Sequence, residues 1–387
     1  MRILFIAPST IPGASGVGDY TTSLAEECAR QGVPSALASL EETLITPEEK
    51  YTRTEEHGIP LLRISSSLPW SEKARLLREF ADGFHPDWVS LQFVCFGFHP
   101  RGLVFSLGRR LRWALPKVKW HVMFHEIWVG RMKGAPWKTR ILGWAQMFSI
   151  RSTIRFLEPL LCHTSNPTYR NLLPEAGVEP LELPLFGNIP IPDPLMPHLL
   201  FEELEAAGLE APVSHERYCI FGIYGTLHPV WPPEPFLSHV QKACQQMKKT
   251  PVFVSIGSIG VGEELWRTMG HTYEPAVRFV RLGHQSPEKI AHFFAGLDFG
   301  VAASNYQLIG KSSSAAAMLE HGVPLVANRE EFYGLPSDHE PCEDPLVILM
   351  KDGLAEKIAA KLPHRPPRWR LDEITEEFLE DIRDGSA

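Results

Sequence analysis

The sequence predicts a two-domain α/β protein in which each domain holds a parallel β-sheet with helices on both faces. Short runs rich in Val, Ile, Leu and Phe recur along the chain and alternate with helix-length amphipathic stretches. Strands that are apolar throughout are typical of parallel sheets buried on both faces. With 387 residues, the chain also exceeds the length that one hydrophobic core usually supports.

The expected strands of the first half lie near residues 2–7, 35–40, 60–64, 87–93, 119–125, 160–164 and 181–186. Those of the second half lie near residues 219–224, 251–256, 277–282, 298–303, 323–328 and 345–349. Helix boundaries are marked as well. Residues 20–31 form an amphipathic helix that ends at Gly32, and Ser286-Pro287-Glu288 supplies a cap, a first-turn proline and an acid.

A proline-dense stretch, Asn188–Pro194, separates the halves and cannot form a central strand or a helix. We therefore expect an N-terminal domain over 1–190, a linker over 191–215 and a C-terminal domain over 216–369. The stretch from Leu371 to Ile382 is amphipathic and acidic, so its apolar stripe needs another surface to cover it.

Composition excludes several classes of function. A net charge of −8 argues against non-specific nucleic-acid binding through a basic surface. The six cysteines are scattered, with no metal spacing, and neither a D-x-D motif nor a His/Asp cluster suggests a metal. The first apolar run is too short for a signal peptide, and no run reaches the ~18 residues of a membrane span. These features predict a cytoplasmic protein with reduced thiols.

The first candidate ligand loop is Ser15-Gly16-Val17-Gly18-Asp19-Tyr20, at the start of a helix. Glycines let backbone amides approach a ligand, and a helix N-terminus favours an anion. A nicotinamide-binding fingerprint, with Glu41 or Glu42 on the ribose, is an alternative. However, Thr21 stands where its third glycine belongs, and eight residues separate the strand from Gly16. A purely structural loop is the other alternative.

Two further strand ends carry polar and aromatic residues. One strand ends in Phe124-His125-Glu126, where a neutral imidazole can bond a sugar hydroxyl. The strand over 87–93 is followed by a run that extends from Gln92 to Phe98 and His99, whose aromatic rings can stack on a sugar or an apolar acceptor or simply pack in the core.

In the second half, Lys311-Ser312-Ser313-Ser314 opens a helix after the strand Phe299–Ala303. Hydroxyls, amides and one cation at a helix start suit a diphosphate. The run nearly matches a nucleotide-binding P-loop, but Asn305 replaces its first glycine. Plain helix capping is the remaining alternative.

Residues 131–155 interleave cations with aromatic and aliphatic residues. This pattern indicates weak contact with a membrane surface or an anionic acceptor, or else a helix with a solvated charged face.

These motifs, taken in order, resemble the retaining "group 1" (family 4-like) glycosyltransferases of GT-B fold. The resemblance rests on Met1–Gly32, on Phe124-His125-Glu126, on the run from Arg281 to Ser304 and on His321–Ala327. It implies two facing Rossmann-like domains, with the donor held mainly by the C-terminal one and the acceptor mainly by the N-terminal one. It also implies that a last helix, 370–387, returns to the N-terminal domain.

The resemblance implies a role for each candidate. His125 and Lys311 would be catalytic. The diphosphate of a UDP- or GDP-sugar would contact Gly16, Gly18, Gly225, Thr226, Lys311, Ser312 and Ser313, and the nucleoside Gly257, His284 and Gln285. The acceptor, which the sequence leaves open as a glycan, a small molecule or a lipid-linked group, would contact Asp19, Tyr20, Gln92, Phe98, His99 and Glu126. No metal or further cofactor is expected, because cations and helix dipoles neutralise the leaving group.

The sequence departs from the family at two places. The family's two glutamates correspond to Ala317 and Ile309, and its Arg/Lys pair is missing from Gly225–Trp231. We therefore predict a retaining, metal-independent hexosyltransferase. The donor diphosphate is expected between Gly16/Gly18 and the Lys311 loop. The departing diphosphate would itself act as the base that takes the proton of the acceptor hydroxyl. The alternatives are a GT-B-like protein that binds without transfer, an epimerase acting on the nucleotide sugar, and a nicotinamide enzyme.

Overall fold

The computed structural model describes the chain except for residues 14, 329–331, 337–338, 351–352 and 386–387. The described residues divide into two compact units. Unit 1 comprises Met1–Leu185, Glu331–His339 and Leu371–Ala387, and unit 2 comprises Phe186–Glu330 and Glu340–Arg370. Each unit is built on one mainly parallel sheet, so the predicted fold class is confirmed.

The sheet of unit 1 has the strand order β3-β4-β2-β1-β5-β6-β7-β8. Its strands are β1 (Ile3–Ala7), β2 (Ser35–Glu42), β3 (Tyr51–Glu56), β4 (Ile59–Ser65), β5 (Trp88–Phe93), β6 (Lys119–Phe124), β7 (Leu161–Thr164) and β8 (Leu181–Glu182). Because β1 lies between β2 and β5, the direction of chain progression across the sheet reverses at β1. Ligands of open parallel sheets bind beyond the strand ends at such a point.

Two strands of unit 1 differ from expectation. The edge strand β3 pairs antiparallel with β4 and was not predicted, because its sequence Tyr-Thr-Arg-Thr-Glu-Glu has no apolar run. The strand expected over 181–186 is reduced to β8, because Pro184 has no N–H to continue the ladder.

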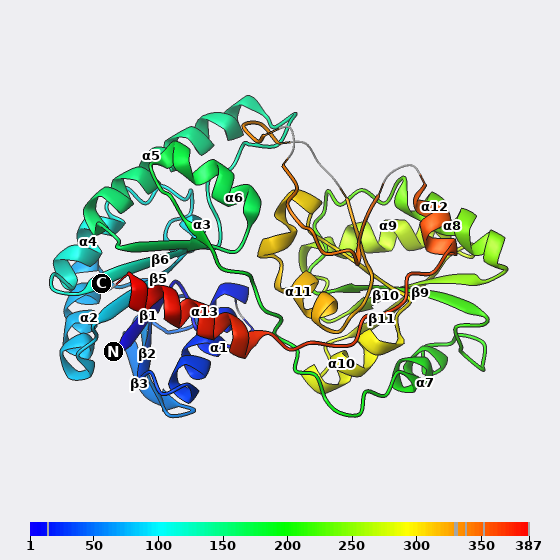
Figure 1. Cartoon of the computed structure of the whole chain (residues 1–387), viewed down its shortest axis with the longest axis horizontal. Helices are drawn as coiled ribbons and strands as arrows, with labels where there is room; N and C mark the ends of the chain where they lie inside the picture. Colours follow the sequence, from blue (N-terminus) through cyan, green and yellow to red (C-terminus); the bar gives the residue numbers. More distant parts are fainter. Residues whose placement is uncertain (14, 329–331, 337–338, 351–352, 386–387) are drawn as a thin grey trace. The chain divides into compact units, whose positions relative to one another are not determined.

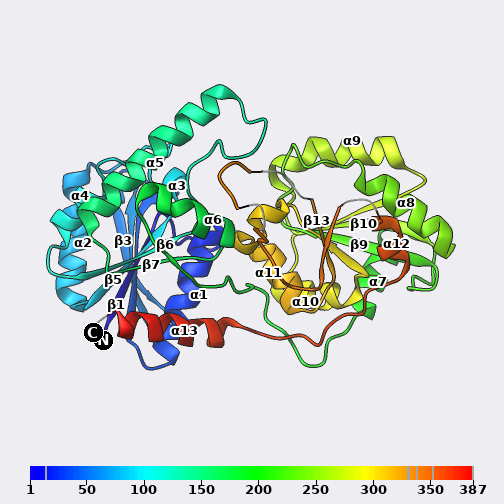
Figure 2. The same ribbon diagram turned by 45° about the horizontal axis from the view of Figure 1, so that its top comes forward.

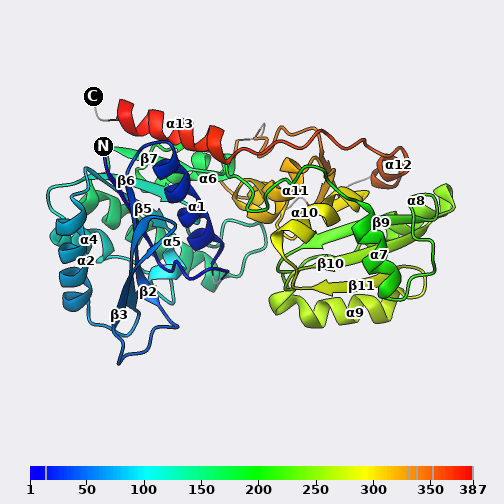
Figure 3. The same cartoon turned by 90° about the horizontal axis from the view of Figure 1, so that it is seen from below.

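The helices of unit 1 are α1 (Gly16–Arg30), α2 (Trp70–Phe84), α3 (Cys95–Phe98), α4 (Leu107–Ala114), α5 (Trp137–Leu157), α6 (Pro167–Leu172), the 3₁₀ helix η1 (Leu173–Ala176) and α13 (Leu371–Asp384). Helix α1 begins four residues earlier than predicted, because the Ser15 hydroxyl accepts the Gly18 N–H at 3.4 Å and caps it. Figures 1 and 3 show α13, the last helix of the chain, beside α1.

The sheet of unit 2 has the order β11-β10-β9-β12-β13-β14, and its chain progression reverses at β9. Its strands are β9 (Tyr218–Tyr224), β10 (Thr250–Ile256), β11 (Arg278–Gly283), β12 (Phe299–Val301), β13 (Leu325–Ala327) and β14 (Val347–Leu349), all parallel. Its helices are α7 (His198–Ala206), α8 (Phe236–Met247), η2 (Gly260–Gly262), α9 (Glu263–Tyr273), α10 (Pro287–Gly296), η3 (Tyr306–Lys311), α11 (Ser313–Glu320) and α12 (Leu354–Ala359).

Two hydrophobic clusters cover the two faces of this second sheet. One joins the sheet to α7, α10 and α11, and the other joins it to α8, α9 and α12. Figure 2 shows these two groups of helices on opposite sides of the strands. Residues 191–215 do not form the expected linker: Leu200, Leu204, Leu209 and Val213 are buried in the first cluster, so this segment belongs to unit 2.

Candidate functional site

The predicted donor residues follow four neighbouring strands of unit 2. Gly225 and Thr226 follow β9, Gly257 follows β10, His284 and Gln285 follow β11, and the Lys311 loop lies between β12 and α11. These strands are parallel and adjacent in the order β11-β10-β9-β12, so all four loops emerge at one edge of the sheet. The edge includes the reversal point at β9, where ligands of open parallel sheets bind.

Gly225 and Gly257 provide space at this edge rather than free donors. Both have positive φ angles, +81° and +84°, which other residues rarely adopt. Their N–H groups are already used: Gly225 donates to the Ile256 carbonyl at 2.9 Å and Gly257 to the Gly283 carbonyl at 2.8 Å. A side chain added at Gly225 would meet nothing within 4 Å, so the open surface beside it is consistent with a ligand.

The Lys311 loop ends in a well-formed helix start. The Ser312 hydroxyl accepts the Ala315 N–H at 3.3 Å and lies 3.1 Å from the Ser314 hydroxyl. Ser312 therefore caps α11, as the structural alternative predicts, while Lys311, Ser312 and Ser313 stay half-buried. Among the neighbours on this edge, Thr226 and His284 are exposed, and the Gln285 amide donates to the Leu282 carbonyl at 2.7 Å.

The two positions that carry glutamates in the resembling family are both buried and apolar here. Ala317 is fully buried, because Gly187 packs directly on α11: a Cβ at Gly187 would lie 2.7 Å from the Ala317 Cα. Ile309 is buried in the same cluster. A carboxylate at either place would lack room or solvent.

In unit 1 the structure brings together three residues that the sequence selected separately. His125 follows β6, Gln92 lies on β5 and Tyr20 lies on α1. The His125 Nε2 and the Gln92 Oε1 are 2.8 Å apart, and the Tyr20 and His125 rings meet edge to face with centroids 4.9 Å apart. His125 is only 6% exposed.

The glycine loop before α1 is tightly packed. Gly18 is buried, and a Cβ there would lie 2.4 Å from the Ser9 carbonyl oxygen, so packing alone requires glycine at this position. Gly16 is exposed. The Asp19 carboxylate accepts the Gly13 N–H at 2.9 Å, and burial raises the pKa of Asp19 above its ordinary value despite that bond.

The other predicted acceptor residues lie near the same edge of the first sheet. Phe98 ends α3 and Glu126 follows His125, and both are half-buried. The His99 Nδ1 accepts the N–H groups of Arg101 and Leu103 at 3.1 and 3.2 Å, so this ring caps a turn.

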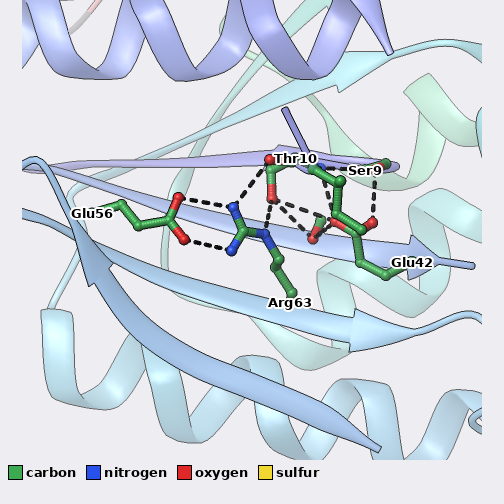
Figure 4. Close-up of polar contacts among 7 residues, drawn as sticks. Ser9, Thr10, Glu42, Glu56 and Arg63 are labelled. Carbon is green, nitrogen blue, oxygen red and sulfur yellow. Dashed lines mark hydrogen bonds and ion pairs between the residues drawn. The ribbon is translucent and has the colours of Figure 1, made fainter. Parts of the chain in front are cut away.

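A buried carboxylate anchors the loop after β1 (Figure 4). Glu42 is fully buried and accepts from the Ser9 hydroxyl at 2.7 Å, from the Thr10 N–H at 2.8 Å and from the Ser39 hydroxyl. The Arg63 guanidinium bonds Thr10 and forms a two-pronged pair with Glu56. Since these groups occupy Glu42, it is not available to a ribose, which weakens the nicotinamide alternative.

A pocket of about 570 Å³ lies in unit 1 beside α5. Its lining is mostly aromatic and aliphatic, with two guanidinium groups and one carboxylate: Trp128, Val129, Gly130, Arg131, Trp137, Arg140, Ile141, Trp144, Met147, Glu175 and Tyr333. The carboxylate of Glu175 pairs with Arg131 at 2.7 Å. The pocket includes Tyr333, which comes from the second half of the sequence and which sequence reasoning did not connect to this region.

Within the described part of the chain, no group of three or more His, Cys, Asp or Glu side chains could hold a metal ion. The six cysteines all lie among the described residues and form no disulfide; five are buried and Cys342 is half-buried. Among the helices that the structure describes, none combines the length and the apolar character that a membrane crossing requires.

Sequence reasoning missed a row of polar residues behind His125: the buried Ser90, His121 and His163, and the half-buried Asp381. The available signal was the presence of polar side chains within otherwise apolar strands, as in Trp-His-Val-Met-Phe of β6. Such residues need buried hydrogen-bond partners, although the sequence does not say which.

Neither the scan against protein-family models nor the search of curated proteins found a match. Solved structures do match over the whole chain. HepE from Anabaena, in complex with UDP and glucose, has a TM-score of 0.58 at 14% identity, with 99% of this chain and 100% of that chain covered. The catalytic domain of starch synthase IV from Arabidopsis thaliana, bound to ADP and acarbose, has a TM-score of 0.57 at 11% identity, with 100% and 99% covered.

UDP-GlcNAc 2-epimerase from Methanocaldococcus jannaschii is also similar, with a TM-score of 0.51 at 10% identity and coverage of 99% and 100%. At these identities the likeness concerns the fold. Three observations agree with this fold: the two units are built on mainly parallel sheets, the last helix belongs to the first unit, and the similarity to these structures extends over the full chain. The chain has the GT-B fold.

Proposed function

We propose that this protein is a glycosyltransferase that uses a nucleotide-sugar donor. The observation that carries the proposal is the edge of the second sheet, where Gly225, Gly257, His284 and the Lys311 loop follow four adjacent parallel strands at the reversal point. Similar structures solved in complex with UDP, UDP-glucose and ADP support a nucleotide ligand.

In this proposal the donor diphosphate contacts Lys311, Ser312 and Ser313, where the α11 N-terminus and the ammonium group favour an anion. Gly225 and Thr226 give it room, and Gly257, His284 and Gln285 contact the nucleoside. Within unit 1, the family resemblance adds His125 as a contact of a sugar hydroxyl and Asp19, Tyr20, Gln92, Phe98, His99 and Glu126 as contacts of the acceptor.

The proposed step is a transfer with retention that needs no metal. The acceptor oxygen forms a bond to the anomeric carbon on the face that the diphosphate leaves, while the bond from that carbon to the diphosphate breaks. The acceptor's proton passes to a departing diphosphate oxygen. Lys311 and the helix dipole stabilise the charge that develops on the leaving group.

A panel of UDP- and GDP-sugars tests the proposal. Purified protein is incubated with each donor, with and without cell extract as a source of acceptors, and released nucleotide and anomeric configuration are measured. A K311A variant should lose most of the donor turnover, whereas K357A, which removes an exposed lysine on α12, should not. Normal turnover by K311A would remove Lys311 from the mechanism.

Two other functions have specific support. The similarity to a UDP-GlcNAc 2-epimerase favours a reaction on the donor itself, which would change the sugar without any acceptor. The buried, apolar Ala317 and Ile309 favour a protein that binds a nucleotide sugar or glycan without transfer. Product analysis in the absence of acceptor identifies the first, and donor binding without turnover in every extract identifies the second.

We also propose that α5 contacts a membrane surface. Its sequence holds four cations (Lys138, Arg140, Arg151 and Arg155) and no acidic residue, in a chain of net charge −8. Trp137 and Trp144 are 67% and 64% exposed beside the pocket of α5. Exposed indole rings next to cations suit the interface of an anionic bilayer.

Co-sedimentation with vesicles of phosphatidylcholine and phosphatidylglycerol tests this contact. A W137S/W144S variant should bind such vesicles several-fold more weakly than the wild type. L44S, which removes an equally exposed apolar side chain from the β2–β3 connection, should bind normally. Equal binding by the tryptophan variant and the wild type would contradict the proposal.

A further inference from the structure

A continuous chain of polar side chains crosses the interior of unit 1 from α13 to His125. Its first links are Asp381 Oδ2 to His163 Nε2 at 2.9 Å, His163 Nδ1 to His121 Nε2 at 3.0 Å and His121 Nδ1 to Ser90 Oγ at 2.8 Å. It continues from Ser90 Oγ to Gln92 Nε2 at 2.7 Å and from Gln92 Oε1 to His125 Nε2 at 2.8 Å. All five residues after Asp381 are buried.

Local structure explains why these side chains meet. Ser90 and His121 are register partners on the parallel strands β5 and β6, and His163 lies on the next strand, β7. Helix α13 covers this face of the sheet. Its Phe378 ring packs 5.3 Å from the His121 ring and 6.3 Å from the His163 ring, which holds Asp381 at the end of the chain of bonds.

The carboxylate at one end determines the direction of the first two bonds. An ionised carboxylate only accepts, so His163 carries its proton on Nε2, and in the neutral ring its Nδ1 must accept. His121 therefore donates from Nε2 and accepts at Nδ1. Burial lowers the pKa of both imidazoles, strongly for His121, which keeps both rings neutral and leaves each with one donor and one acceptor.

The same reasoning extends to His125. Because the His121 Nδ1 accepts, the Ser90 hydroxyl donates to it and must accept from its other neighbour, Gln92. The Gln92 amide nitrogen therefore faces Ser90, and its carbonyl oxygen faces His125. That oxygen accepts from the His125 Nε2–H, so in the neutral ring Nδ1 is the nitrogen without a proton.

We infer that Asp381 is a positioning residue for His125, acting through His163, His121, Ser90 and Gln92 to fix the Nε2–H tautomer of His125. Nδ1 is then the acceptor nitrogen of His125 at the carboxyl end of β6, so a hydroxyl group that approaches this nitrogen would donate to it. The tautomer follows from the chain of bonds alone; only the identification of that hydroxyl with a sugar rests on the proposed function.

Nitrogen-15 NMR of the histidine rings tests the inference, because the ring shifts and their couplings to carbon-bound protons distinguish the two tautomers. Spectra are recorded on the full-length protein without donor or acceptor, so the result does not depend on sugar transfer. We expect His125 to show a single Nε2–H form in the wild type. An Nδ1–H form, or an equal mixture, would overturn the inference.

The D381N variant tests the role of the carboxylate. An asparagine can both donate and accept, so the direction of the chain is no longer imposed, and we expect the His125 nitrogen shifts to move towards those of a tautomer mixture. D384N, the same substitution at an exposed position of α13, should leave them unchanged. Unchanged His125 shifts in D381N would refute a role for Asp381.

A double-variant comparison separates transmission along the chain from general loosening of α13. Ser90→Ala removes the middle link at little cost in volume. If the chain transmits the effect, adding D381N to S90A should cause no further change at His125. Equal effects of D381N in both backgrounds would show that it acts by another route. Thermal unfolding of each variant verifies that the protein is folded.

Discussion

Restoring a glutamate at position 317 would test whether packing excludes the carboxylate that the resembling family places there. Ala317 is fully buried on α11, and the backbone of Gly187 approaches it so closely that even a methyl group on Gly187 would lie 2.7 Å from the Ala317 Cα. The neighbouring Glu320 carboxylate already accepts the Gly187 N–H at 2.9 Å. The site therefore offers a new carboxylate no space and places it close to an existing carboxylate.

The expected cost has two parts. Forcing extra atoms into a packed core costs about 1–3 kcal/mol. An unpaired buried carboxylate adds about 3 kcal/mol or more. The sum, about 4–6 kcal/mol, is comparable with the total stability of a typical domain, about 5–15 kcal/mol. For a unit of this size the A317E variant should melt at least about 10 °C below the wild type.

Scanning calorimetry measures this change directly. A316E, the same substitution one residue earlier at a half-buried position of α11, is the matched control and should shift the melting point much less. If A317E melted within about 2 °C of the wild type, the space beside Ala317 would be open, and the reasoning about packing would be wrong. A gain in donor turnover by A317E would refute it as well.

Three further outcomes are expected. Glu42→Ala leaves the buried Thr10 N–H and the Ser9 hydroxyl without their acceptor, so it should reduce the free energy of unfolding in urea by about 2–4 kcal/mol. The control E49A, at an exposed glutamate, should leave that free energy unchanged. Burial raises the pKa of Asp298, but the hydrogen bond from His215 and further contacts outweigh it, so its pKa lies below the ordinary value. A carboxylate with a lowered pKa stabilises the fold above about pH 4, and this contribution is lost as the pH falls through the pKa of the folded state. D298N should therefore be less stable than the wild type at pH 7 by about 1–3 kcal/mol, and this difference should disappear in acid. A stability difference that does not depend on pH would contradict the prediction. Phe378→Ala removes the fully buried ring by which α13 packs on the sheet, and it should lower the free energy of unfolding by about 3–5 kcal/mol. Hydrogen exchange of the α13 amides should become faster. Unchanged exchange would show that the ring does not keep α13 packed on the sheet.

Local sequence was sufficient to predict every described strand except the edge strand β3, and the starts of α10 and α11. Apolar runs such as Ile-Leu-Phe-Ile-Ala of β1 identify strands that are buried on both faces. The caps at Ser286 and Ser312 were readable because a hydroxyl before a helix satisfies an amide only a few residues away. The grouping of donor residues in unit 2 was also predictable, since each follows a strand and parallel strands end at the same edge.

Elements without a local apolar pattern were not predictable. The edge strand β3 exposes most of its side chains, so no periodicity reveals it. Residues 191–215 are rich in proline yet supply buried leucines to unit 2. Residues 332–336 and His339 join unit 1 despite their place in the second half of the chain. In each case the partner surface, and not the segment itself, determines the structure.

The sequence by itself determined two parallel α/β units, the places where ligand loops leave their strands and the residues that offer amides, hydroxyls and one lysine there. Only the tertiary structure decided which polar residues share a bond. Asp381 and His163 are 218 positions apart, and no local rule relates them. Backbone geometry and burial act over a few residues, whereas a buried hydrogen bond depends on which distant elements pack together, and that is settled only when the whole unit folds.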